Sequence, residues 1–212
     1  MKFDALLRVF NTEAYFDYSS VALLFPEGDE SIRTALYRFK KKGHVIELRR
    51  GLYAFAELYR KATLNGPLVA QALYAPSYLS ERWALSFYGV IPEKTVVYTS
   101  VTPRSTKDFV NAWGRFSYRT LKPTLFTGFA TETIGGSKVR IATPEKALLD
   151  LWYLEKGDWT ETRMESMRFE PGVIAIESLL EAADSSGIPR LERAAATWSN
   201  YAAESMKGRI EL

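Results

Sequence analysis

The chain has 212 residues, of which 47% are hydrophobic and 25% are charged, and its formal net charge is +3. This composition is that of an ordinary globular protein with room for one large core or two small ones. Because cysteine is absent, disulfides, thiolate metal sites and cysteine nucleophiles are excluded, which fits a reducing compartment. We expect a cytoplasmic protein that does not cross a membrane, since the N-terminus lacks a secretory signal and the longest uncharged stretch, residues 62–80, is broken by two prolines.

Three helices are predicted before residue 45. The first two cover residues 2–10 and about 19–25, and a Pro-Glu-Gly turn follows them. The third covers residues 29–42 and ends at Gly43. Its apolar residues have helical spacing and share an inward face: Ile32, Ala35, Leu36 and Phe39. Its outward face combines positive charges for phosphates with groups able to hydrogen-bond to base edges in a major groove. The members of that face are Ser31, Arg33, Thr34, Tyr37, Arg38, Lys40, Lys41 and Lys42.

A hairpin with a positively charged tip is predicted after the third helix. Residues 45–48 and 52–55 have strand composition, and the turn between them holds Arg49, Arg50 and Gly51. Such a tip suits a minor groove or a phosphate backbone. Residues 29–50 contain seven Lys or Arg and three Asp or Glu, a net charge of +4 in a chain of +3. The positive charge is therefore concentrated in one segment, which favours a nucleic-acid partner.

The order of these elements predicts a winged helix-turn-helix DNA-binding domain over residues 1–60. Each element alone has a simpler explanation. A charged helix face is usually solvated surface, and Lys40, Lys41 and Lys42 also complement the negative end of the helix dipole. The succession of three helices, a turn and a hairpin favours DNA binding over that explanation.

Residues 66–212 are predicted to form a second domain, with the boundary between Glu57 and Gly66. The fold class is α+β, a winged helix-turn-helix followed by a small, mainly antiparallel sheet packed with helices. Strands are predicted over residues 94–101, 115–121, 125–130 and 137–142. Helices are predicted from Pro67 onward and over residues 80–88, 144–157, 175–183 and 189–206. Thr143 and Pro144 mark the start of the helix over 144–157, as N-cap and first helical residue.

Catalytic groups are scarce, and we expect neither an enzyme nor a metal or cofactor site. The single histidine, His44, lies between the basic helix and the hairpin, where we expect a turn residue or a phosphate contact. Glu145 and Asp150 stand five apart on one helix and are expected to point in different directions. Arg115 and Arg119 share one face of a strand. The two arginines could form a small anion-binding surface there, and the simpler explanation is that this face of the sheet is in contact with solvent.

Four stretches occur in a recognisable order: RRGLYAF at 49–55, SYLSERWALSFYGVIPE at 77–93, TPR at 102–104 with GRFSYR at 114–119, and IATPEKALLDLWY at 141–153. Together they resemble the AbiEi-type antitoxins, the transcriptional-regulator half of abortive-infection (phage defence), type IV toxin–antitoxin systems. The resemblance extends to about residue 200. It implies a repressor of its own operon that neutralises a nucleotidyltransferase-like toxin encoded next to it, without requiring a stable complex. It also implies operator contacts by Arg33, Thr34, Tyr37, Arg38 and residues 49–51, and gives the C-terminal motifs no chemical role.

The sequence therefore favours a cytoplasmic transcriptional repressor that reads double-stranded operator DNA, as an inverted repeat, and acts as an antitoxin. One alternative is a free-standing regulator whose C-terminal domain senses a small ligand, which a deep apolar pocket with a few polar groups would favour. The other is an enzyme, which needs a metal or nucleotide that no motif indicates.

Overall fold

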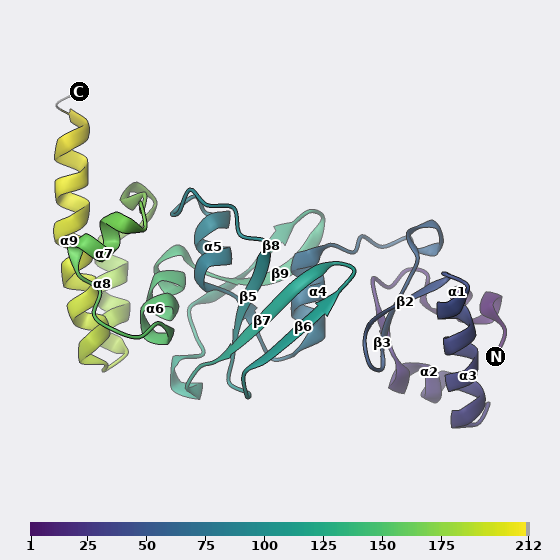
Figure 1. The fold of residues 1–212 in the computed structure, drawn as a ribbon. Coiled ribbons are helices and arrows are strands. Elements are labelled where there is room, and N and C mark those ends of the chain that lie inside the picture. The colour runs from purple at the N-terminus through teal and green to yellow at the C-terminus, as the bar shows by residue number, and fades with distance from the viewer. Residues whose placement is uncertain (211–212) are drawn as a thin grey trace.

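The computed structural model describes residues 1–210 and the side chains of residues 1–205. The molecule is elongated (Figure 1). An N-terminal unit of residues 1–60 lies at one end, a six-stranded sheet occupies the middle, and the long helix α9 (Pro189–Ile210) stands at the other end. Within this described part of the chain, no helix combines the length and the apolar character that a membrane crossing needs.

The N-terminal unit consists of three helices and a small antiparallel sheet. Its helices are α1 (Phe3–Phe10), α2 (Tyr18–Leu24) and α3 (Asp29–Lys41), and its strands, in the order β1-β3-β2, are β1 (Phe16–Asp17), β3 (Leu52–Phe55) and β2 (Val45–Arg49). The Asp17 side chain caps α2 by accepting a hydrogen bond of 2.7 Å from the backbone N–H of Ser20. The three predicted helices and the hairpin are confirmed, and β1 has no counterpart in the prediction. That this unit is a winged helix stays a prediction.

The inward face of α3 is the one that its sequence pattern predicts. Its four apolar residues, Ile32, Ala35, Leu36 and Phe39, are at most 8% exposed. They pack in one core with Leu6 and Phe10 of α1, Val21 of α2 and Phe55 of β3. This packing fixes which side of α3 faces solvent.

The larger unit, residues 66–210, surrounds a mixed sheet. Its strands are β4 (Tyr78–Leu79), β5 (Val97–Thr102), β6 (Lys107–Asn111), β7 (Gly114–Thr120), β8 (Phe129–Ile134) and β9 (Ser137–Ala142). Its helices before α9 are α4 (Gly66–Leu73), α5 (Glu81–Phe87), α6 (Pro144–Leu154), α7 (Glu161–Ser166) and α8 (Ile176–Ser185). Short 3-10 turns occur at Glu57–Tyr59, Pro123–Leu125 and Pro171–Val173. Helices α6 to α9 gather at the end of the molecule farthest from the N-terminal unit (Figure 1).

The strand order β6-β7-β5-β4-β9-β8 contains two parallel pairs. β5 runs parallel to β7 over its full length, and β4 runs parallel to β9 at Leu79 and Ile141. The other three neighbouring pairs are antiparallel. The sheet is therefore mixed: antiparallel pairs are in the majority, as predicted, and the two parallel pairs were not predicted. The parallel pairing of β5 with β7 arises from β6, an edge strand that pairs antiparallel with β7 and turns the chain so that β7 runs beside β5 in the same direction.

The strand predicted over residues 125–130 is wrong in position. Pro123 opens a 3-10 turn at its start, because proline fixes φ and has no N–H for a strand ladder. The turn ends at Leu125, Gly128 adopts a φ of +71°, and β8 begins only at Phe129.

The β2–β3 hairpin belongs to both hydrophobic cores. Phe55 packs in the core of the N-terminal unit, whereas Leu48, Leu52 and Ala54 pack in the core of the larger unit. The Nδ2 group of Asn111, at the end of β6, donates a hydrogen bond of 3.0 Å to the backbone oxygen of Leu48. The hairpin thus holds the two units together.

Candidate functional site

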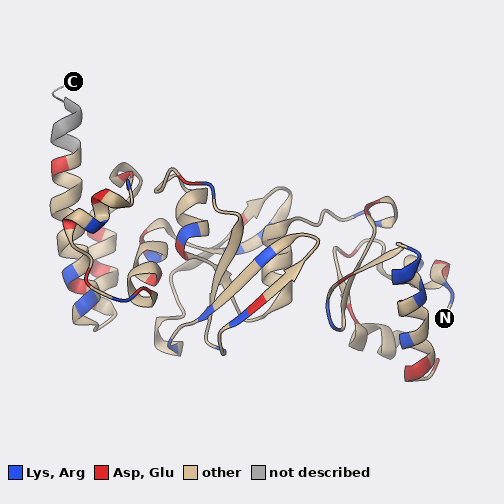
Figure 2. Cartoon of the chain, in the orientation of Figure 1, with Lys and Arg blue, Asp and Glu red and all other residues tan. Residues whose placement is uncertain are grey.

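The outward face of α3 is a continuous polar surface. All eight residues predicted for this face are exposed: Ser31, Arg33, Thr34, Tyr37, Arg38, Lys40, Lys41 and Lys42. Tyr37 is 59% exposed although it is aromatic. Positive charge recurs along the helix from an acidic N-terminal end (Figure 2). The structure therefore brings these residues together on one accessible face.

Two of the positive charges on α3 already have partners. The Arg33 guanidinium lies 4.2 Å from the ring centroid of Tyr18, whose hydroxyl donates to the backbone oxygen of Asp29 at 3.3 Å. The Lys40 ammonium lies 2.5 Å from a carboxylate oxygen of Glu47 on β2, and this hydrogen bond raises the pKa of Lys40.

The remaining positive side chains are those of Arg38 and Lys41 on α3 and of Lys42, which caps its C-terminal end. None of them forms an ion pair with another residue that the structure describes. These three groups are the ones available to an anionic partner.

The three residues of the hairpin tip have different surroundings. Arg49 turns toward the larger unit, where its Nε donates a hydrogen bond of 2.8 Å to the backbone oxygen of Leu73. Gly51, at a φ of +77°, accepts a hydrogen bond of 2.8 Å from the backbone N–H of Tyr18. Arg50 is exposed, and so is Arg49. Both cations of the predicted wing tip are therefore accessible, and Arg49 is in addition held against the larger unit.

His44 lies in the turn between α3 and β2, as predicted. Its ring packs against two aromatic rings, with centroid distances of 4.6 Å to Phe3 and 5.3 Å to Tyr59. A structural role in the turn accounts for its position.

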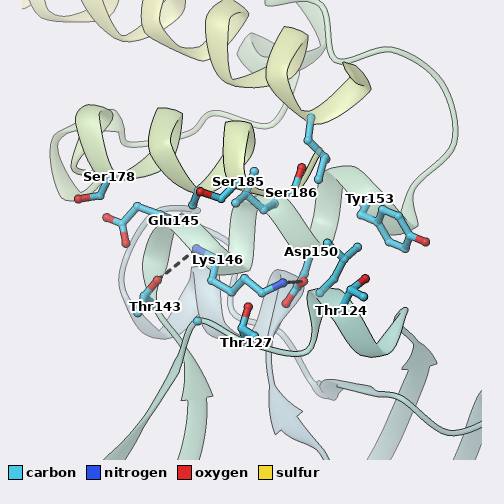
Figure 3. Close-up of a pocket in the computed structure, with 15 residues that line it drawn as sticks. Thr124, Thr127, Thr143, Glu145, Lys146, Asp150, Tyr153, Ser178, Ser185 and Ser186 are labelled. Carbon is cyan, nitrogen blue, oxygen red and sulfur yellow. Dashed lines mark hydrogen bonds and ion pairs between the residues drawn. The ribbon is translucent and has the colours of Figure 1, made fainter. Parts of the chain in front are cut away.

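A second candidate site is a pocket of about 430 Å³ in the larger unit, between α6, α8 and the loop before β8 (Figure 3). Its apolar lining comes from Leu125, Leu149, Ala182 and Leu191. Its polar lining comes from Thr124, Thr127, Thr143, Glu145, Lys146, Asp150, Tyr153, Ser178, Ser185 and Ser186. The size and the mixed lining are those of a site for a small molecule.

Asp150 is the centre of a buried polar network beside this pocket. Its carboxylate is 1% exposed and accepts hydrogen bonds from the Tyr78 hydroxyl at 3.0 Å, the Ser80 hydroxyl at 2.7 Å and the Lys146 ammonium. Burial raises the pKa of Asp150, and Lys146 opposes that effect. Burial and the nearby Asp150 also raise the pKa of Tyr78. The hydroxyl groups and the ammonium thus satisfy a charge that would otherwise be costly to bury.

Local structure places Lys146 across the pocket floor (Figure 3). Thr143 caps α6 by accepting a hydrogen bond of 3.2 Å from the backbone N–H of Lys146. The Lys146 stem passes over Gly128, where an added Cβ would lie 3.0 Å from the Lys146 Cγ. A glycine at this position therefore allows both the positive φ of the loop and the close approach of the lysine.

Glu145 and Asp150 bind different groups, although both line the pocket. Glu145 Oε1 accepts a hydrogen bond of 3.0 Å from the backbone N–H of Ala175, at the start of α8. Asp150 instead turns to Tyr78 and Ser80. The two carboxylates therefore diverge as predicted, but the pocket between them is not apparent from their spacing.

The network of Tyr78, Ser80, Lys146 and Asp150 was not predicted from the sequence. One indication was present in the sequence, because Asp150 interrupts an apolar run and its neighbours Leu149, Leu151 and Trp152 are buried. A carboxylate in a predicted core position requires partners. Lys146 stands four residues before it, where a helical ion pair is expected.

Arg119 binds a buried carboxylate and is not part of a solvated strand face. Its Nη1 lies 2.9 Å from Glu81 Oε2, and its Nη2 donates a hydrogen bond of 2.5 Å to the backbone oxygen of Leu154. Glu81 is 3% exposed, and burial raises its pKa to about 7, although Arg119 lowers it. Arg115, predicted to share this face, is exposed and lacks this contact.

No protein-family model matches the chain, and no curated protein matches it as a relative. Among the described residues, no group of three or more His, Cys, Asp or Glu side chains is placed to hold a metal ion. The two candidate sites, the α3 face and the pocket beside Asp150, are therefore judged on their own geometry.

Proposed function

We propose that the chain is a sequence-specific DNA-binding repressor whose N-terminal unit is a winged helix. The observation that carries this proposal is the exposed face of α3, where Arg38, Lys41 and Lys42 form no ion pair with any described residue and lie beside hydrogen-bonding side chains such as Thr34. Unpaired cations on one helix suit phosphates, and polar side chains between them suit base edges. Arg50 at the hairpin tip is positioned for an additional backbone contact. An inverted-repeat operator would present the same surface to two copies of the chain.

The antitoxin role is part of the same proposal and rests on the resemblance of the four sequence stretches to AbiEi-type regulators. In that role the chain counteracts a nucleotidyltransferase-like toxin, and a direct complex with the toxin is not assumed. Its test is growth of cells that express the toxin gene adjacent to this chain's gene, with and without the chain. Failure to restore growth would leave a repressor without antitoxin activity.

The repressor proposal is tested with the full chain and two duplexes, one from its own promoter region and one unrelated, at two salt concentrations. We expect selective binding to the promoter duplex and weaker binding at higher salt. Arg38→Ala should reduce that selectivity, whereas Arg115→Ala, an exposed substitution on β7, serves as the matched control. Equal, weak binding to both duplexes would overturn the proposal.

A second candidate function is favoured by the pocket beside Asp150. In this version the chain is a regulator whose larger unit senses a small ligand. The lining carries Glu145, Lys146 and Asp150, a formal charge of −1, together with several hydroxyl groups. These groups favour an uncharged or cationic ligand that offers hydrogen-bonding groups and an apolar part.

The ligand-sensing version is tested by thermal unfolding with a panel of amino acids, sugars and nucleosides. A ligand should raise the unfolding midpoint of the unmodified chain. Ala182→Trp, which fills the pocket from α8, should abolish the rise, whereas Ala196→Trp on the exposed side of α9 should retain it. If no compound raises the midpoint, or if Ala182→Trp retains the rise, the ligand-sensing function would be rejected.

A further inference from the structure

A basic pocket of about 270 Å³ lies where the β2–β3 hairpin meets the larger unit. It is enclosed by the tip of the hairpin, the end of α4 and the β5–β6 connection. Its lining residues are Arg49, Ala72, Leu73, Tyr74, Ala75, Arg104, Lys107 and Phe109. The lining thus contains positively charged side chains from both units and no carboxylate.

Neutral groups hold the charged side chains of this pocket in place. The Arg49 Nε donates to the backbone oxygen of Leu73 at 2.8 Å, and the Arg104 Nη1 donates to the backbone oxygen of Ala75 at 2.9 Å. The Arg104 guanidinium lies 4.6 Å from the ring centroid of Tyr74, and the Lys107 ammonium lies 5.6 Å from the same centroid.

The positive charges of Arg49, Arg104 and Lys107 are not compensated by acidic groups. None of the three forms an ion pair with any residue that the structure describes. Like charges gathered in one pocket repel each other, and a bound anion relieves that repulsion.

We propose that this pocket binds a phosphoryl group. Each guanidinium has five N–H donors and uses only part of them in the contacts above, so both arginines retain donors for the oxygens of a tetrahedral dianion. Because Arg49 comes from the hairpin and Arg104 and Lys107 come from the larger unit, the bound group fastens the hairpin to that unit. The phosphoryl group belongs either to a DNA backbone or to a free phosphorylated small molecule. The proposal stands independently of the repressor function.

The proposal is tested by titrating the full chain with inorganic phosphate at constant ionic strength, following the heat of binding and the midpoint of thermal unfolding. We expect saturable binding and a rise in the midpoint.

Lys107→Gln and Arg104→Gln should each weaken phosphate binding by about tenfold or more, because each removes a charge-assisted contact. Lys107 is exposed on β6, so its substitution leaves the fold intact. Arg115→Gln, on β7 outside the pocket, is the matched control and should bind as the unmodified chain does. Absence of saturable binding, or equal affinity in all four proteins, would overturn the proposal.

A second arm identifies the source of the phosphoryl group. If the phosphoryl group belongs to DNA, Lys107→Gln should weaken binding to any duplex and lower the salt dependence of duplex binding by about one unit of slope. Inorganic phosphate should then compete with the duplex for the pocket. For a free small molecule, Lys107→Gln binds duplexes normally and phosphate binds equally well with and without DNA. Failure of the α3 variants to alter DNA binding would overturn the repressor proposal and leave the phosphate titration unaffected, so the two proposals fail separately.

Discussion

The outward face of α3 and the network around Asp150 contain similar residue types in opposite surroundings. On α3 the side chains of Arg38, Lys41 and Lys42 are exposed and have no acidic partner among the described residues. Around Asp150, two hydroxyl groups and one ammonium converge on a carboxylate that is 1% exposed. The buried charges are therefore satisfied within the fold, whereas the exposed charges are available to another molecule.

The largest effect is expected when the buried network is broken. Asp150→Ala should lower the free energy of unfolding by about 3–5 kcal/mol, because Lys146 loses its partner and two hydroxyl groups lose their acceptor. Urea denaturation measures this change. The matched control is Asp184→Ala, an exposed carboxylate on α8, which should shift the free energy by less than about 0.5 kcal/mol. Similar small losses in both variants would show that the network does not stabilise the fold.

The α3 face should show the opposite behaviour, with a change in binding and none in stability. Arg38→Ala should reduce affinity for the specific duplex by about 1–3 kcal/mol, while urea denaturation stays unchanged. Lys41→Ala or Arg50→Ala should weaken binding to all duplexes and lower the salt slope by about one unit. Titrations at several salt concentrations distinguish the two patterns. Equal behaviour of the three variants would contradict the assignment of α3 as the base-reading helix.

Glu81 is a buried carboxyl group whose pKa lies near neutrality, so pH distinguishes it from the exposed carboxyl groups. Its pKa rises from about 4.5 to about 7, mainly through burial. A carboxyl group with a raised pKa binds its proton more tightly in the folded chain, so its stabilising contribution is present at low pH and is lost as pH rises from about 4.5 to about 7. Glu81→Gln should flatten this part of the stability profile, and Glu177→Gln, exposed on α8, should not. Denaturation at a series of pH values measures both. An unchanged profile in Glu81→Gln would assign the pH dependence to other groups.

The smallest effect is expected at Lys40 and Glu47, a pair that links the α3 face to β2. A double-mutant cycle of Lys40→Ala and Glu47→Ala should give a coupling of about 0.2–1 kcal/mol in the free energy of unfolding, as for other exposed ion pairs. The coupling should decrease in high salt. A coupling of several kcal/mol would mean that this end of α3 resembles the buried network more than an exposed helix face.

Local features of the fold were predictable from the sequence. The spacing of Ile32, Ala35, Leu36 and Phe39 predicts the buried side of α3, and the remaining side chains of the helix are left exposed. Thr143 and Pro144 predict the start of α6, and the structure shows the hydrogen bond from the Lys146 N–H to the Thr143 hydroxyl. Such patterns depend on contacts between residues a few positions apart, which the sequence displays directly.

Contacts between distant residues were not predictable. β6 has the mixed composition KDFVN because it lies at a sheet edge with much of its surface in solvent, so it lacks the apolar alternation of a half-buried strand. The parallel pairing of β5 and β7 depends on that missed strand. The pocket at the hairpin tip was also not predictable from the sequence, because it combines Arg49 with Arg104 and Lys107 from another part of the chain. From the sequence, Arg49 was predicted only as a wing-tip residue.

The pairing of Leu79 in β4 with Ile141 in β9 also has a consequence for the order in which the chain folds during synthesis. The helices and the hairpin of residues 1–60 share one core and are close in sequence, so we expect their contacts to form early in synthesis. The hydrogen bonds of Tyr78 and Ser80 instead require Asp150, which is synthesised about seventy residues later. At typical translation rates of about 5–20 residues per second, this delay is several seconds. During that interval the apolar side chains of β4 and α5 lack their final neighbours. A nascent chain held at about residue 130 would thus expose apolar surface that attracts chaperones.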